Sequence, residues 1–231
     1  MINYIYLGDY MNLNSFKGTL YDLLGYFAPG LVSIICSVAI MLKINDISDL
    51  YSIFKEIGKN ITALEVFTLI IIAYVIGHAI ASLSSWLIEK NLIERISRLN
   101  KLLDSKSILG DEHYEALCTK YKMVFNTQYN DKSIRRIICH VQAKQNLVYE
   151  TALIFLSFYG MARNFSFIFG ACFCVEVWYC VFKGGKFHAL IFFALLCVVF
   201  LYEYIRFRKY FLDTILSGFL IPEKENFKEK N

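Results

Sequence analysis

The sequence predicts an all-α, polytopic membrane protein with four transmembrane helices and a helical cytoplasmic extension between the second and the third. Of its 231 residues 57% are hydrophobic, the mean hydropathy is +0.45, and two residues are proline. This composition is typical of a helical membrane protein rather than of a soluble domain. Four apolar runs are long enough to cross a bilayer, because about 20 helical residues span its hydrocarbon core. None alternates as the strands of a β-barrel do.

We expect the four spans at residues 23–42, 64–88, 165–182 and 187–205. The first span also carries local signals near its start. Asp22 is positioned to cap this span, and Pro29 with Gly30 is expected to bend it near its cytoplasmic end. The bend is either a hinge or a fixed kink that serves helix packing.

The second span carries a polar stripe at steps of three or four residues, which places the stripe on one helical face. Its members are Tyr74, His78, Ser82, Ser85 and Glu89. These side chains either hydrogen-bond to neighbouring helices or line a water-filled path, since polar groups in a span rarely face lipid. A ridge of small residues, Ala73, Gly77, Ala81 and Ser85, favours close helix packing.

The third apolar run is longer than one crossing needs and contains a charge. It extends over residues 151–182 and includes Arg163, Asn164 and Glu176. Either one long helix starts below the membrane, or the helix breaks at Gly160. We favour the long helix, which puts Arg163 near the interface and leaves the preceding apolar residues in need of cover from other subunits or from the stalk. Glu176 either pairs with Lys183 at the outer interface or acts as a permeation or gating charge.

The middle segment predicts three helices outside the membrane. Apolar residues from Leu92 to Leu103 continue the second span as a stalk, residues 112–125 form a second helix, and 126–131 form a loop. A third helix begins near Ser133 and runs into the third span. The densest basic group here is Lys120, Lys122, Lys132, Arg135, Arg136, His140 and Lys144. It contacts either anionic lipid headgroups or a phosphate-rich ligand.

The basic residues also predict the orientation. The segment from Lys90 to Arg163 holds 12 Lys and Arg against seven Asp and Glu, and the chain from Arg206 adds six more Lys and Arg. By the positive-inside rule, the middle segment and both termini are cytoplasmic. The expected organisation is a cytoplasmic segment at 1–22, spans at 23–88, a cytoplasmic helical segment at 89–164, spans at 165–205, and a cytoplasmic tail at 206–231, polar enough to be disordered from Pro222.

Catalytic and metal-binding patterns find little support. The seven cysteines are odd in number and lie mostly in spans or in the cytoplasmic segment, which disfavours a disulfide scaffold. His113, Cys118, Cys139 and His140 lack the spacing of a zinc motif. No nucleotide-binding or hydrolase motif is recognised. We therefore expect no enzymatic activity, no metal and no cofactor.

Several short motifs together resemble a known class of protein. They are Tyr21-Asp22, Gly25-Tyr26 and Pro29-Gly30 at the first span, Gly77-His78 in the second, the basic middle segment, and Arg206-Phe-Arg-Lys209 after the fourth. With the layout of most of the chain, they resemble small four-span bacterial membrane proteins of anti-phage defence systems, of the Hailong and Kiwa types. The resemblance implies a homotetrameric inner-membrane protein. For the Hailong type it implies an ion channel effector controlled by a nucleic-acid-like product of a partner nucleotidyltransferase.

The sequence thus leads to two functional expectations. The first is an oligomeric channel or membrane-disrupting effector in the bacterial inner membrane, in which span two lines the path. In it Pro29 and Gly30 bend, Arg163 and Glu176 are gating charges, and a cytoplasmic anionic nucleotide or oligonucleotide is bound. Its ligand residues are Lys120, Lys122, Arg135, Arg136, His140 and Lys144. The alternative is a non-conducting sensor or scaffold that signals to a soluble partner protein.

Overall fold

The computed structural model describes residues 21–41, 61–93, 103–183 and 187–222, with isolated positions between 52 and 58. The described chain consists of helices with short connecting loops and contains no strand, which confirms the predicted fold class, and four of its helices are long and apolar enough to cross a membrane. The elements are η1 (Leu23–Phe27), α2 (Ala28–Met41), α4 (Ala63–Ser84), η2 (Ser85–Ile93), α6 (Ser105–Leu109), α7 (Asp111–Phe125), η3 (Asp131–Ser133), α8 (Ile134–Lys144), α9 (Asn146–Lys183) and α10 (Phe187–Leu220). The expectations for residues 1–20, the stalk at 94–102 and the tail from 223 lie outside the described residues.

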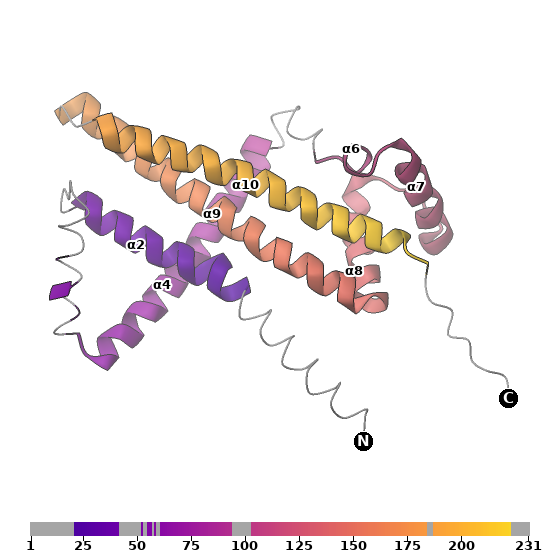
Figure 1. Ribbon diagram of the computed structural model, residues 1–231, viewed down its shortest axis with the longest axis horizontal. Helices are drawn as coiled ribbons and strands as arrows, with labels where there is room; N and C mark the ends of the chain where they lie inside the picture. Colours follow the sequence, from indigo (N-terminus) through magenta and orange to yellow (C-terminus); the bar gives the residue numbers. More distant parts are fainter. Residues whose placement is uncertain are drawn as a thin grey trace, which may run out of the picture.

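The longest feature is the antiparallel pair of α9 and α10, which lie side by side along the whole molecule (Figure 1). At 1.5 Å per residue their 38 and 34 residues correspond to about 57 and 51 Å. Both helices are therefore longer than the hydrocarbon core of about 30 Å. α9 passes through Gly160 without a break, as the favoured interpretation of this run predicts.

The second pair, α2 and α4, crosses steeply at a point of close backbone approach (Figure 1). A Cβ atom built on Gly30 would lie 1.8 Å from the carbonyl oxygen of Ala73, and one built on Gly77 would lie 1.9 Å from that of Tyr26. Only glycine fits at such distances. α4 begins with a capping box, in which Thr62 and Glu65 satisfy each other's backbone N–H groups.

The best-buried core lies at the far end of α9 and α10, beyond the crossing of α2 and α4. Leu117 and Tyr121 of α7, Ile137 and Val141 of α8, and Phe219 of α10 are almost completely buried there.

The apolar start of α9 is also covered within the chain. Phe155 packs on Tyr210 and Phe158 on Phe207, so α10 supplies the cover that we expected from other subunits or from the stalk.

The α6–α8 end follows the sequence closely, with one correction. α7 ends at Asn126, whose φ of 53° lies in the left-handed region that asparagine tolerates, and the predicted loop follows. The third predicted helix, however, does not run into the third span. It breaks at Gln145, whose φ of −136° and ψ of 64° are not helical. The break lets α8 fold back so that Ile137 and Val141 reach the core.

The first turn of the bundle also differs from expectation. Asp22 has helical backbone angles and makes no capping hydrogen bond, because the helix already includes Tyr21.

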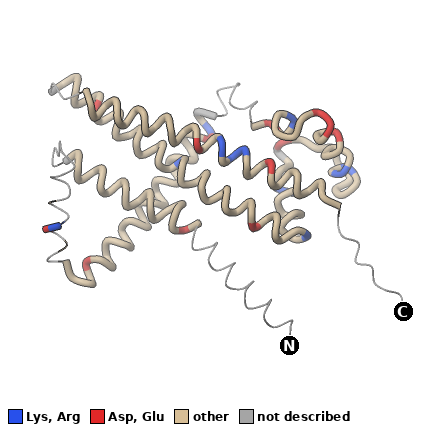
Figure 2. The backbone as a smooth tube through the Cα atoms, viewed as in Figure 1, with Lys and Arg blue, Asp and Glu red and all other residues tan. Residues whose placement is uncertain are grey.

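Charged side chains are sparse along α2, α4 and the first half of α10, and they gather on the second half of α10 and on α6–α8 (Figure 2). The start of α2 and the end of α10 point toward this charged end (Figure 1).

Candidate functional site

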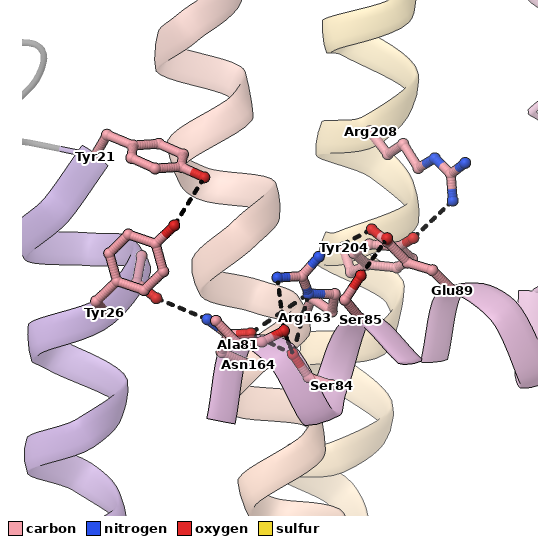
Figure 3. Close-up of polar contacts among 11 residues, drawn as sticks. Tyr21, Tyr26, Ala81, Ser84, Ser85, Glu89, Arg163, Asn164, Tyr204 and Arg208 are labelled. Atoms are coloured by element: carbon pink, nitrogen blue, oxygen red, sulfur yellow. Dashed lines mark hydrogen bonds and ion pairs between the residues drawn. The ribbon is translucent and has the colours of Figure 1, made fainter. Parts of the chain in front are cut away.

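Arg163 lies at the centre of a polar network inside the helix bundle (Figure 3). Its guanidinium contacts three groups of the α4–η2 helix. Nη1 lies 3.0 Å from Oε1 of Glu89, Nε donates to Oγ of Ser84 at 3.1 Å, and Nη2 donates to the carbonyl of Ala81 at 3.4 Å. The Arg163 side chain is 11% exposed and that of Glu89 is 24% exposed. The charge in the apolar run is therefore neutralised within the chain.

Asn164 extends the network to η1, which directly precedes α2. Its Oδ1 accepts a hydrogen bond from Ser84 at 2.5 Å, and its Nδ2 donates to the carbonyl of Gly25 at 2.7 Å. That carbonyl stands four residues before Pro29, which has no N–H to donate to it. Asn164 thus supplies the hydrogen bond that the proline removes. One buried amide ties η1, α4 and α9 together.

Two π-helical turns face this network. η1 precedes Pro29, and Ala28 donates its N–H to Leu23, five residues back. η2 carries Glu89, whose Oε2 accepts from Ser85 at 2.8 Å, beside Tyr204 and Arg208 of α10 (Figure 3). Such turns are rare in helices and are frequent at functional sites. They displace the side chains of these helices from regular α-helical positions just where they meet α9.

The predicted polar stripe divides into two parts. Ser85 and Glu89 turn toward Arg163, whereas Tyr74, His78 and Ser82 lie on the surface of the chain. Two tyrosines frame the imidazole. Its ring stacks on Tyr26 at a centroid distance of 3.8 Å and meets Tyr74 edge-on at 4.6 Å.

A small pocket of about 370 Å³ opens at the boundary between these two parts. Its lining combines aromatic, hydroxyl and cationic groups: Tyr26, His78, Ala81, Ser82, Ser85, Trp86, Lys90 and Arg163. The pocket therefore joins the surface half of the stripe to the buried ion pair.

The small residues of α4 serve helix packing. Ala73, Gly77 and Ala81 are buried; Ala73 meets the backbone of Gly30 in α2, and Gly77 meets that of Tyr26 in η1. Gly30 is held in the same contact, which favours a fixed kink at Pro29 and Gly30 over a hinge. Glu176 lies half-buried in α9, about three and a half turns from Arg163, and the side chain of its expected partner Lys183 lies outside the described residues.

The basic middle segment forms an open cleft of about 830 Å³ where the loop after α7 meets the start of α8. The cleft is lined by Phe125, Thr127, Gln128, Asn130, Ser133, Arg135, Arg136, Cys139 and His140. Arg135 and Arg136 lie in the first turn of α8, and His140 lies one turn further on. Three of the six predicted ligand residues are therefore brought together.

The other predicted ligand residues lie elsewhere. Lys120 donates to the carbonyl of Ile221 at 2.8 Å, and its ammonium lies 5.4 Å from the centre of the Phe219 ring, so it caps the end of α10. Lys122 and Lys144 are exposed and do not line the cleft. Lys144 shares a helical face with Arg136, eight residues before it, but the cleft follows the loop before α8 rather than that face.

Tyr121 is the residue beneath the cleft that sequence reasoning missed. It is completely buried, and its hydroxyl makes no hydrogen bond within the described structure. Burial raises the pKa of Tyr121, but the neighbouring Ser133, Arg136 and Thr127 more than offset this, so its pKa lies below the usual value. All three neighbours line the cleft. A tyrosine in an amphipathic helix gives no sequence signal of such a position.

The chain was compared with protein-family models, with curated proteins and with solved structures, and no match was found. The described chain offers two candidate sites, the polar face of α4 with its ion pair and the basic cleft.

Proposed function

We propose that the chain assembles into an oligomeric channel or membrane-disrupting effector of the bacterial inner membrane, with both termini in the cytoplasm. A cytoplasmic anionic nucleotide or oligonucleotide controls its activity. The resemblance to four-span anti-phage proteins supports a homotetramer, a role in defence and a ligand made by a partner enzyme. No catalysis by the chain is involved.

One observation carries the proposal. Tyr74, His78 and Ser82 lie exposed on α4, within a helix that is long and apolar enough to cross a membrane. In a monomer they would face lipid, where the phenol hydroxyl of Tyr74 and the imidazole of His78 are costly, whereas Ser82 bonds the carbonyl of His78. An oligomer that turns this face toward a shared axis hydrates them instead. The pocket at Ser82 then opens onto the axis, with the Glu89–Arg163 pair at its base.

Ion flux through purified protein in liposomes tests the proposal. Flux is measured with and without adenosine 5′-monophosphate or short oligoadenylates on the side of α8. We expect ligand-dependent flux that Ser82→Leu lowers about tenfold or more, because an apolar side chain dewets a narrow path. Ser37→Leu is the matched control, since both serine hydroxyls are exposed and bond a carbonyl four residues back, and Ser37 lies on α2, outside the polar stripe.

Two results would contradict this function. One is the absence of flux from folded, oligomeric protein under every ligand condition. The other is equal flux in the Ser82→Leu and Ser37→Leu proteins, which would remove the polar face of α4 from the path.

A second function, a non-conducting sensor or scaffold, is favoured by one surface. Met123 and Val124 of α7 are 74% and 40% exposed at the α6–α8 end, and exposed apolar side chains of this kind suit contact with a soluble protein. In that case alanine at His78 and Ser82 changes stability but not membrane potential. Co-purification of a soluble partner that Met123→Ser abolishes would support this function.

A further inference from the structure

We propose that the cleft at the start of α8 binds the phosphate group of a nucleotide, which Arg136, the first turn of α8 and the hydroxyl of Tyr121 hold together. The inference rests on the proposed function for the role of the ligand, because it identifies the site and the chemistry through which a cytoplasmic ligand would act. Phosphate binding itself does not require that the chain conduct ions.

The position of the two arginines is the first observation. Arg135 and Arg136 occupy the first turn of an 11-residue helix that has no acidic residue in that turn. The N-terminus of a helix carries partial positive charge and disfavours cations. Within the described residues neither arginine forms an ion pair, and the nearby Asp131 instead accepts a hydrogen bond from Tyr129. A bound anion would satisfy the arginines and the helix N–H groups at once.

The hydroxyl of Tyr121 is the second and independent observation. A buried hydroxyl without a hydrogen bond is uncommon and costs stability. This hydroxyl lies among Thr127, Ser133 and Arg136, all of which line the cleft. A phosphate oxygen beside Arg136 would accept this donor.

The size and walls of the cleft point to a nucleotide rather than to a bare phosphate. At about 830 Å³ the cleft is in the range of small-molecule sites and far larger than one phosphate group. Phe125 provides an aromatic wall, and the amides of Gln128 and Asn130 can hydrogen-bond to the edge of a base. Phosphate and base would thus meet different parts of one cleft.

The cleft also contacts a helix that leads to the membrane. The His140 ring meets Phe219 of α10 edge-on at 5.2 Å, and Phe125 stacks on the same Phe219 at 6.2 Å. α10 is continuous from Phe219 back to Tyr204 and Arg208, which lie beside Glu89. A ligand that repositions His140 or Phe125 therefore acts on the end of a helix that reaches the ion pair.

Calorimetric binding of adenosine 5′-monophosphate to the full-length protein in phosphatidylcholine nanodiscs tests the site. We expect adenosine 5′-monophosphate to bind and adenosine to bind at least about tenfold more weakly, because the charge-assisted bonds are lost. Arg136→Gln should weaken binding about tenfold or more, and Lys122→Gln, an equal charge change outside the cleft, less than about twofold. Equal weakening by both variants, or no binding, would overturn the proposal.

Tyr121→Phe separates a binding role from a structural one. Because the hydroxyl has no partner, its removal should leave the melting temperature unchanged or raise it. The same variant should weaken adenosine 5′-monophosphate binding about fivefold to tenfold, since a donor to the phosphate is lost. Unchanged affinity in a folded Tyr121→Phe protein would remove Tyr121 from the site and overturn the proposal.

Two further arms identify the source of the phosphate and the consequence of binding. Phosphatidylglycerol in the nanodiscs should leave the affinity for adenosine 5′-monophosphate within about twofold in 0.15 M salt. Competition that Arg136→Gln abolishes would assign the phosphate site to a lipid headgroup and overturn the nucleotide assignment. Binding that depends on Arg136 without any flux supports the site and contradicts the channel. Flux without such binding supports the channel and contradicts the binding site.

Discussion

At the scale of single residues, the cation of Arg163 in an apolar helix is neutralised and hydrogen-bonded by other residues of the same chain. Arg163 is partnered by Glu89, Ser84 and the carbonyl of Ala81, and Asn164 beside it is 1% exposed with both ends of its amide bonded. A charge in such surroundings is tolerated only when it is paired and hydrogen-bonded. Both halves of the pair are then needed for stability.

A double-mutant cycle measures this dependence. Glu89→Gln should lower the free energy of unfolding by about 3 kcal/mol, because it leaves the Arg163 cation without its counter-charge. Arg163→Gln should cost a similar amount, and the double variant should cost less than the sum of the two. Thermal and denaturant unfolding in detergent supply the values. Additive costs would show that the pair acts as two independent groups.

At the scale of elements, the crossing of α2 and α4 depends on backbone contact rather than on side-chain interdigitation. Gly30 approaches the backbone of Ala73, and Gly77 approaches that of Tyr26. Small residues at such crossings let helices gain packing and polar contacts in a lipid environment, where the hydrophobic effect does not drive helices together. The contact also brings Gly25 within reach of Asn164.

Alanine substitutions at two glycines test whether the crossing of α2 and α4 requires glycine. Gly30→Ala should destabilise the protein by about 1–3 kcal/mol, since its Cβ meets a backbone that is not free to move aside. Gly160→Ala should stabilise by up to about 1 kcal/mol, because nothing lies within 4 Å of the added Cβ and alanine is the better helix former. Melting temperatures in detergent compare the two. An equal loss in both would contradict the crossing.

Elements that depend on local signals could be predicted, and those that depend on tertiary contacts could not. The periodicity of α7 and the Asn126 to Asp131 loop gave the second extramembrane helix within a residue of its start. The break at Gln145 has no local marker. It follows from the packing of Val141 and Val148 against Gly218 of α10. The continuation of α10 past Arg206 was missed for the same reason.

In the candidate sites, too, local sequence signals could be read from the sequence, whereas tertiary contacts could not. Arg163 and Glu89 could each be singled out because charged residues are rare in apolar runs, but their pairing across two helices could not. Asn164 was named beside Arg163 but given no role, although Pro29, four residues after Gly25, leaves the Gly25 carbonyl without its helical donor. Arg135, Arg136 and His140 share the cleft as a local cluster. Tyr121 joins them only through the folding of α7 onto α8.

At the scale of the whole molecule, α10 connects the two candidate sites. Its 34 residues run without interruption from Phe187, past Tyr204 beside the ion pair, to Phe219, whose ring contacts His140 and Phe125 of the basic cleft (Figure 1). If all four membrane-length helices cross, the chain ends on the side from which it starts. A ligand bound in the basic cleft would then act on the bundle through α10.

Reporter fusions test this arrangement. If all four helices cross and the basic segment is cytoplasmic, a fluorescent protein fused after Asn231 should fluoresce, and one fused to the N-terminus should as well. Alkaline phosphatase fused after Gly185, between α9 and α10, should be active. An active phosphatase at the C-terminus would invert the orientation and place the basic cleft outside the cell.

In the proposed function, the exposed polar face of α4 lines an ion path. Single-channel recording from purified protein in a planar bilayer, with wild type compared to Ser82→Asp under a salt gradient, tests this path. We predict ligand-dependent openings and a reversal potential that Ser82→Asp shifts toward cation selectivity, because a ring of carboxylates attracts cations. Openings with an unchanged reversal potential, or no openings from folded oligomeric protein, would contradict the claim.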